Sequence, residues 1–262
     1  MPIDTAFVGA LHVEYLKKRD LLDHEERAHH TLFQTSTIDL LLDGNYDGDV
    51  RFADLAHRGD FGLGTLNALD GEMIALDGRF YQVKADGRAY PVDERARTPF
   101  AVVTTFEPDI RRSLTTPMDF RSLCEHLDRL IGDEPGCCAI RVDGSFDRVK
   151  TRSVPRQRKP YPPLVEVLGS QPTFELRGVA GSLVGFRFPQ YAQGINVAGY
   201  HFHFITDDRS AGGHVLDCRL ARGELHVDHE ADLRLELPAG VDEAMPDLVA
   251  SKKDALKRIE NV

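Results

Sequence analysis

The sequence predicts an α+β protein of two lobes, each built on mixed or antiparallel β-sheets with a few helices. Six Asp-Gly dipeptides punctuate its first 144 residues, and Asp-Gly between apolar runs indicates a tight turn. Short apolar or alternating runs lie between these turns, whereas helical spacing is rare. Strands followed by isolated helices, without regular alternation of the two, favour this class over a parallel α/β fold.

The expected strands begin with a meander. Its runs are residues 61–69, 72–76 and 79–83, which are separated by Asp-Gly turns. Further strands are expected at 101–106 and 139–142. Hairpins should therefore dominate the first half of the chain.

Two helices are expected. Thr116 as N-cap and Pro117 in the first turn begin one of them. Its apolar positions follow helical spacing and are Phe120, Leu123, Leu127 and Leu130. Ser251 and Asp254 resemble a variant capping box, which predicts a short helix at the C-terminus.

A proline-rich stretch, PRQRKPYPPL at residues 155–164, is the expected domain junction. Proline removes ladder donors and fixes extended backbone. We therefore expect an N-terminal sheet lobe of residues 1–165 and a C-terminal sheet lobe of residues 166–262.

Composition narrows the functional classes. Lys and Arg number 32 against 42 Asp and Glu, and the net charge of −10 disfavours general binding to nucleic acid or to an anionic membrane. The apolar runs are far shorter than the ~20 residues of a membrane helix. The N-terminus lacks a signal-peptide pattern, so we expect a cytoplasmic protein, although an exported form could have lost its signal peptide.

Four cysteines, Cys124, Cys137, Cys138 and Cys218, include an adjacent pair and no CxxC motif. A chain of this size needs no disulfide scaffold, so reduced thiols are expected. Cys218 differs from the others because it lies close to a histidine group.

The residues with catalytic potential concentrate in GYHFHFITDDRSAGGHVLDC, residues 199–218. Residues 200–205 suit a strand, which places His201 and His203 on one face. A polar loop then returns the chain into a second strand. If Ile205 pairs with His214, then His203 and His214 are diagonal neighbours with Cα atoms roughly 7–8 Å apart. A slip of one residue would put His214 on the opposite face.

Three imidazoles on one face can bind Zn²⁺ and leave a position open for water or substrate, as a catalytic site requires. Co²⁺, Ni²⁺ or Cu²⁺ would also be accepted. Cys218 is an alternative fourth ligand, and a solvated or hydrogen-bonded histidine pair is the simpler alternative to a metal site. His226 and His229, in LHVDHEADL, lie among acids and are expected to form a solvated surface.

Several long blocks in order resemble the α-acetolactate decarboxylase family. They are GDFGLGTLNALDGEMIALDGRFYQV, TRSVPRQRKPYPPL, PQYAQGINVAGYHFHF and the histidine window, and the resemblance runs from about residue 30 to the C-terminus. It implies zinc-dependent decarboxylation of 2-acetolactate (2-hydroxy-2-methyl-3-oxobutanoate) to acetoin and CO2, and we expect a homodimer. By similarity, His201, His203 and His214 bind Zn²⁺, Glu72 and Glu260 supply catalytic carboxyl groups, Arg152 binds the substrate and Thr65 lines the pocket.

Chemistry agrees with these assignments. A 2-hydroxy-3-oxo acid offers a hydroxyl and a ketone oxygen to one metal, which then acts as the electron sink. Arg152, in the basic stretch KTRSVPRQRK, can grip a carboxylate with two hydrogen bonds, although a solvated loop is the simpler interpretation of that stretch. Glu72 and Glu260 are the candidate proton donors, with the tail folding back over the pocket.

Two other classes stay open from the sequence. A cupin-like metal-dependent oxygenase or isomerase also places His-x-His on a strand, but normally adds a glutamate shortly afterwards, where this chain has Asp207 and Asp208. A non-catalytic metal-containing ligand-binding module is disfavoured because three histidines leave the metal open.

Overall fold

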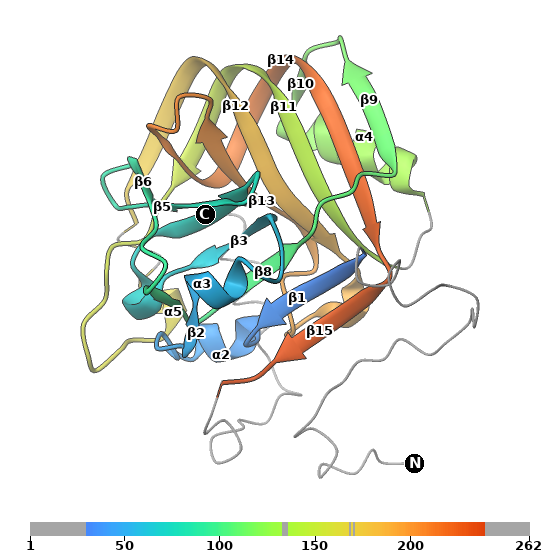
Figure 1. The fold of residues 1–262 in the computed structure, drawn as a ribbon. Helices are drawn as coiled ribbons and strands as arrows, with labels where there is room; N and C mark the ends of the chain where they lie inside the picture. The colour runs from blue at the N-terminus through green and yellow to red at the C-terminus, as the bar shows by residue number, and fades with distance from the viewer. Residues whose placement is uncertain (1–29, 133–135, 168, 170, 239–262) are drawn as a thin grey trace, which may run out of the picture.

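Two β-sheets form most of the computed structural model, which describes residues 30–132, 136–167, 169 and 171–238 (Figure 1). The first sheet has the strand order β15 (Asp232–Glu236), β1 (Thr31–Thr35), β8 (Ala101–Thr104), β3 (Phe61–Thr65), β4 (Glu72–Leu76), β5 (Arg79–Val83), β6 (Ala89–Pro91). The second has the order β10 (Met118–Asp119), β14 (Gly212–Glu230), β11 (Cys137–Arg152), β12 (Thr173–Phe188), β13 (Gly199–Thr206), and β9 (Ile110–Leu114) also pairs with β14. Only β1 and β15 pair in parallel among the described strands.

Short elements complete the described part of the chain. The α-helices are α2 (Ile38–Leu42), α3 (Phe52–Leu55), α4 (Phe120–Ile131) and α5 (Leu164–Val167). Two 3₁₀ turns, η2 (Asn67–Leu69) and η4 (Gln190–Ala192), and a two-stranded sheet of β2 (Val50–Arg51) and β7 (Arg97–Thr98) lie in the connections. This arrangement confirms the predicted α+β class.

The predicted meander is confirmed by antiparallel pairing of β3 with β4 and of β4 with β5. Asp77 and Gly78 join the last two strands with φ angles of 53° and 72°. Two successive positive φ angles are typical of the type I′ turn that suits the twist of a hairpin. The first run is shorter than predicted, because the chain leaves β3 after Thr65 and enters η2.

The second sheet contains strands much longer than predicted, and β11 has 16 residues where the sequence suggested four. The turn predicted at Asp143-Gly144 is wrong, since both residues lie within β11 and pair with Ser182 and Gly181 on β12. A Cβ at Gly144 would lie 2.4 Å from the carbonyl oxygen of Arg222. This glycine therefore permits close approach of neighbouring strands rather than a reversal of the chain.

The two sheets pack together through a shared apolar cluster. The first sheet contributes Leu63, Ile74 and Val102, and the second contributes Val184 and Phe186, all with no solvent exposure. The site described below lies beside this cluster, on strands drawn from both sheets.

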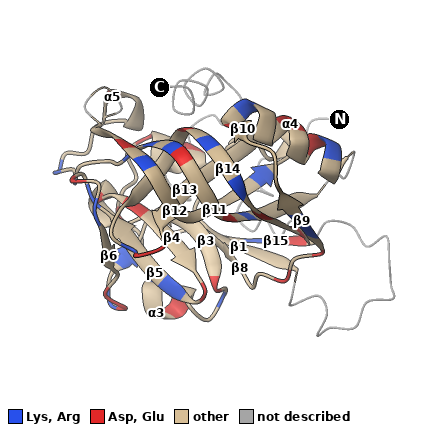
Figure 2. Ribbon diagram, turned by 90° about the horizontal axis from the view of Figure 1, so that it is seen from above, with Lys and Arg blue, Asp and Glu red and all other residues tan. Residues whose placement is uncertain are grey.

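The helix α4 covers the other side of the second sheet, beside β10 and β14 (Figure 2). It buries Leu123 and Leu127, as its helical spacing predicted, and also Ile131, whereas the predicted Phe120 and Leu130 are only partly buried. The predicted N-cap, Thr116, is wrong: Asp119 caps the helix by accepting a hydrogen bond from the backbone N–H of Ser122 at 2.8 Å. The helix begins later because Met118 and Asp119 pair with β14. At 12 residues α4 is the longest described helix, and none of the described helices could span a membrane.

Each of the two sheets contains strands from before and from after residue 165. Strand β11 pairs with β12 and β14, and β15 pairs with β1. The division of the chain into lobes of residues 1–165 and 166–262 stays a prediction about folding units.

Candidate active site

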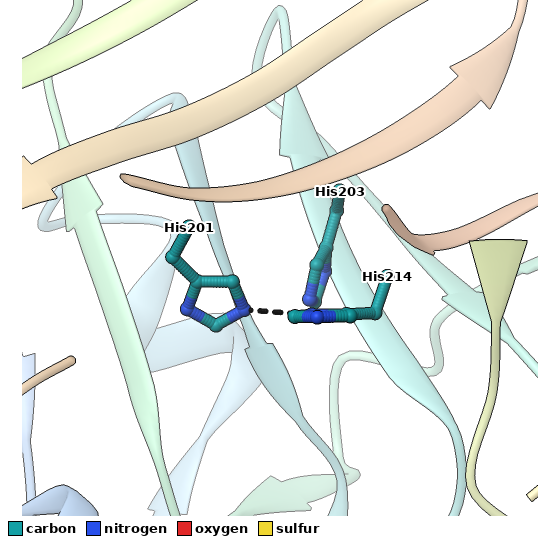
Figure 3. Close-up of side chains that lie close together, drawn as sticks. All are labelled: His201, His203 and His214. Carbon is teal, nitrogen blue, oxygen red and sulfur yellow. Dashed lines mark hydrogen bonds between the residues drawn. The ribbon is translucent and has the colours of Figure 1, made fainter. Parts of the chain in front are cut away.

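Three histidines meet at the hairpin formed by β13 and β14. His201 and His203 lie two residues apart on β13 and share a face, and His214 lies near the start of β14. Their ring centroids are 4.9 to 5.5 Å apart. Figure 3 shows the rings facing one another, with His201 Nε2 3.0 Å from His214 Nδ1. The structure thus brings together the histidines that the sequence singled out.

The predicted register of this hairpin is wrong by two residues. Ile205 lies opposite Gly212, and His203 lies directly opposite His214 rather than diagonally. The reason is that Gly212 and Gly213 belong to the strand and not to the loop. Because the side-chain period of a strand is two, this displacement leaves His214 on the predicted face.

Cys218 does not join the histidines. Lys150 pairs with Asp217 and Thr151 with Val215, so Leu216 is an extra residue on β14. This bulge reverses the alternation of side chains beyond it. Cys218 consequently lies in the apolar core, where burial raises the pKa of its thiol to about 12. The alternative of Cys218 as a fourth metal ligand is therefore wrong.

A backbone carbonyl group orients His203. The Nδ1 of His203 lies 2.9 Å from the carbonyl oxygen of Met73 on β4, and a carbonyl can only accept, so Nδ1 carries the proton. The Nε2 atom then has a free lone pair and points toward Glu72, whose Oε2 lies 3.5 Å away. This contact fixes the tautomer and ring orientation that a metal ligand needs. No sequence signal marks a main-chain contact of this kind.

The electrostatic environment keeps all three imidazoles neutral. Burial is the largest cause in each case: it lowers the pKa of His203 to about 4, and those of His201 and His214 well below the usual value. The charge of Arg152 lowers all three pKa values further. Neutral imidazole is the form that binds a metal ion.

Three further residues named by the sequence line the same cavity. Arg152 is 4% exposed and ends β11 opposite His214, while Glu72 is 8% exposed and begins β4. Thr65 lies opposite Glu72 on β3, and its hydroxyl donates a hydrogen bond to the carbonyl oxygen of Gly71 at 2.7 Å. The cavity, about 530 Å³ including the part open to solvent, thus combines a guanidinium group, a carboxyl group and an imidazole cluster.

Most of the remaining wall is apolar and was not identified from the sequence. It comprises Ile38, Leu41, Leu69, Phe100, Val154, Leu164 and Val197, with Gln171 as a further polar lining residue. These residues come from segments far apart in the chain. In the sequence, nothing separates any of them from an ordinary apolar core residue. Such a wall excludes water and suits a small ligand with alkyl groups.

The donor set fits a zinc ion. Candidate ligand atoms of the three histidines lie within 4.8 Å of one another. Among the described residues, His201 Nδ1, His203 Nε2 and His214 Nε2 are buried without a hydrogen-bond partner. Buried polar atoms normally have a partner, and a metal ion held by the cluster would supply one for His203 Nε2. His201 Nδ1 lies on the opposite edge of its ring from the Nε2 atom that faces His214 (Figure 3).

Other predicted residues lie elsewhere. Glu260 and the predicted C-terminal helix fall outside the described residues. His226 and His229 are half-buried, and His229 Nδ1 lies 3.1 Å from Asp109. The two histidines are therefore partly solvated, whereas the neighbouring acids Asp228 and Glu230 are buried, at 0% and 5% exposed.

Comparison with known proteins gives consistent matches. A family model described as alpha-acetolactate decarboxylase matches residues 32–245. The alpha-acetolactate decarboxylase of Methylococcus capsulatus is 47% identical over 264 residues, which cover 100% of both chains. That of Klebsiella aerogenes is 46% identical and covers 88% of this chain and 89% of its own. The crystal structure of alpha-acetolactate decarboxylase from Bacillus subtilis superposes with a TM-score of 0.83 at 40% identity, and the match covers 88% of this chain and 98% of that one.

Proposed function

Since this chain belongs to the alpha-acetolactate decarboxylase family and is an enzyme of that activity, we propose that it decarboxylates 2-acetolactate to acetoin and CO2 with Zn²⁺ held by His201, His203 and His214. The observation that carries the proposal is the convergence of three histidines, with ligand atoms within 4.8 Å of one another, in a cavity that also contains Arg152 and Glu72. Zn²⁺ bound there would polarise the hydroxyl and ketone oxygens of the substrate and stabilise the negative charge left by loss of CO2.

Arg152 is the proposed anchor for the substrate carboxylate. Its guanidinium is buried at the end of β11, and its positive charge lowers the pKa of all three histidines. A planar guanidinium can donate two parallel hydrogen bonds to a carboxylate. The same donors remain in place to stabilise the enediolate once CO2 has left.

Glu72 is the proposed proton donor within the described residues. Its Oε2 lies 3.5 Å from His203 Nε2, so its carboxyl group borders the space that the imidazole nitrogens face. A carboxylic acid fixed on one side of the enediolate would protonate one face of it and yield a single enantiomer of acetoin. Glu260, assigned by resemblance, would share this duty from the tail.

The remaining groups position the substrate. Thr65 lines the cavity beside Glu72, and its hydroxyl is held by the carbonyl oxygen of Gly71. The apolar wall would accommodate the methyl groups of the substrate and exclude water. Exclusion of water strengthens the interactions of Arg152 and Glu72 with developing charge.

The decisive experiment is incubation of the purified protein with racemic acetolactate, followed by assays for acetoin and CO2. We expect both products, one enantiomer of acetoin, and one bound Zn²⁺ per histidine cluster. Absence of acetoin with a zinc-loaded protein would leave the cupin-like or binding-module alternative, both of which family membership disfavours.

Two expectations about the cell and the assembly stay predictions. We expect a homodimer, which size-exclusion chromatography with light scattering would detect. We also expect a cytoplasmic location, which fractionation would test.

A further inference from the structure

A second group of potential metal ligands lies where β14 ends and the chain passes from the second sheet into the first. It consists of His30, Asp109, Asp228 and Glu230, which we call the seam cluster. In Figure 1 the end of β14 lies beside the start of β1, and the backbone N–H of Ala231 donates to the carbonyl oxygen of His30 at 2.9 Å. The cluster therefore joins three segments that are distant in sequence.

Three members of the seam cluster are already within reach of one ion. Candidate ligand atoms of His30, Asp109 and Asp228 lie within 4.8 Å of one another. His30 Nδ1 lies 2.9 Å from Asp228 Oδ1, and the other oxygen of Asp228 accepts a hydrogen bond from the backbone N–H of Glu107 at 2.7 Å. Asp109 accepts from the backbone N–H of His229 at 2.8 Å. These contacts hold the carboxylates in place.

Glu230 supplies the independent sign of a missing ligand. It is 5% exposed, and neither of its carboxylate oxygens has a hydrogen-bond partner among the described residues. It projects from the same face of β14 as Asp228, two residues earlier. Burial, followed by the charge of Asp228 and then that of Asp109, raises the pKa of Glu230 well above its usual value. The nearby Thr104 hydroxyl opposes this shift, but donates to backbone carbonyl groups.

We propose that the seam cluster binds a divalent transition-metal ion, with Mn²⁺ or Zn²⁺ as the class that accepts carboxylate oxygens together with an imidazole nitrogen. A buried carboxyl group close to other acids is costly to ionise, and a divalent cation would neutralise the group and give the oxygens of Glu230 a partner. The ion would tie β1, the connection between β8 and β9, and the end of β14 together, so its role is structural.

This site is separate from the histidine cluster. His214 and Asp228 lie on the same strand, 14 residues apart, and at about 3.3 Å per residue the path between them is roughly 45 Å. Metal binding at the two places can thus be measured independently. If the proposed decarboxylase mechanism were wrong, the proposal of a metal ion at the seam cluster would still stand. If no metal bound at the seam cluster, the proposed decarboxylase mechanism would still stand.

The test uses the full chain, loaded with one equivalent of Zn²⁺ at the histidines and then titrated with Mn²⁺ by electron paramagnetic resonance. We expect one Mn²⁺ to bind to the wild type and to raise its Tm. Glu230→Gln and Asp109→Asn should each weaken that binding at least tenfold and abolish the rise in Tm. Asp109 is exposed, so its replacement should not impair folding. Asp217→Asn, a half-buried acid of β14 paired with Arg148, is the matched control and should bind Mn²⁺ like the wild type.

Two results would overturn the proposal. In the first result, metal analysis after dialysis finds neither Mn²⁺ nor a second Zn²⁺ in the wild-type protein, and Glu230→Gln is as stable as the wild type. That outcome would identify Glu230 as a protonated, neutral acid. The other is Glu230→Gln that binds Mn²⁺ as tightly as the wild type, which would place the ion elsewhere.

Discussion

Replacement of Arg152 by lysine tests the proposed substrate anchor without removing its charge. Arg152 is 4% exposed at the end of β11, between His214 on β14 and Thr173 on β12. Lysine keeps the positive charge but presents a single ammonium group, which cannot reproduce two parallel hydrogen bonds to a carboxylate. The histidines should therefore stay neutral and zinc binding should be retained, whereas substrate binding should weaken.

The expected loss follows from one hydrogen bond between charged groups. Such a bond contributes about 1.5–3 kcal/mol, which corresponds to a fall in kcat/KM of roughly 10- to 150-fold. Since the guanidinium is proposed to contact the carboxylate before reaction and the enediolate after it, both KM and kcat should change.

The assay measures initial rates of acetoin formation over a range of acetolactate concentrations, together with zinc content and Tm. Arg156→Lys is the matched control: it lies in the same basic stretch, but its side chain is 66% exposed and pairs with Asp70 at 3.2 Å. An exposed pair of this kind contributes little, so the control should retain wild-type kinetics. Wild-type kinetics for Arg152→Lys would refute the reasoning and place the carboxylate anchor elsewhere.

The remaining predictions concern the metal, the tail and pH. Chelation should abolish decarboxylation and Zn²⁺ should restore it; full activity in protein shown by metal analysis to be metal-free would contradict the zinc proposal. Deletion of residues 257–262 should leave Tm and zinc content nearly intact but cut kcat by ~100-fold or more, the range of a lost general acid, and Glu260→Gln should reproduce much of that loss. Unchanged kcat in both would exclude the tail from catalysis. In metal-free protein, burial lowers the pKa of His203 from 6.5 to about 4. Between pH 4 and pH 6.5 the unfolded state therefore binds more protons than the folded state. The free energy of unfolding should consequently fall as the pH drops from 6.5 to 4. Urea unfolding of His203→Gln should show a smaller fall, and an identical pH profile would argue against this cause.

Local patterns in the sequence were sufficient for several features. The alternation of strand residues placed His201 and His203 on one face, and the helical spacing within α4 identified Leu123 and Leu127 as buried. The Asp77-Gly78 turn was equally clear, because only a few residues tolerate two positive φ angles in succession. In each case the deciding interaction is between residues close in the chain.

Features that depend on strand pairing were harder to predict from the sequence. The residue opposite His203 depended on whether Gly212 and Gly213 belonged to the loop or to β14. The sequence does not distinguish these two possibilities. The bulge at Leu216 removed Cys218 from the histidine face, and Asp143-Gly144 continued β11 rather than turning, because strands on both sides pair with it. Pairing energy from distant strands outweighed the local preference of the dipeptide.

The sequence by itself determined the residue types of the site and, through its resemblance to a family, the reaction to expect. Only the tertiary structure decided that Thr65, Glu72 and Arg152 line one cavity with the histidines, that the Met73 carbonyl oxygen fixes the tautomer of His203, and that Glu230 is buried. The physical reason is that burial, and with it every pKa shift in the site, arises from segments of two sheets packed together, and the amino-acid order of any one segment does not contain that information.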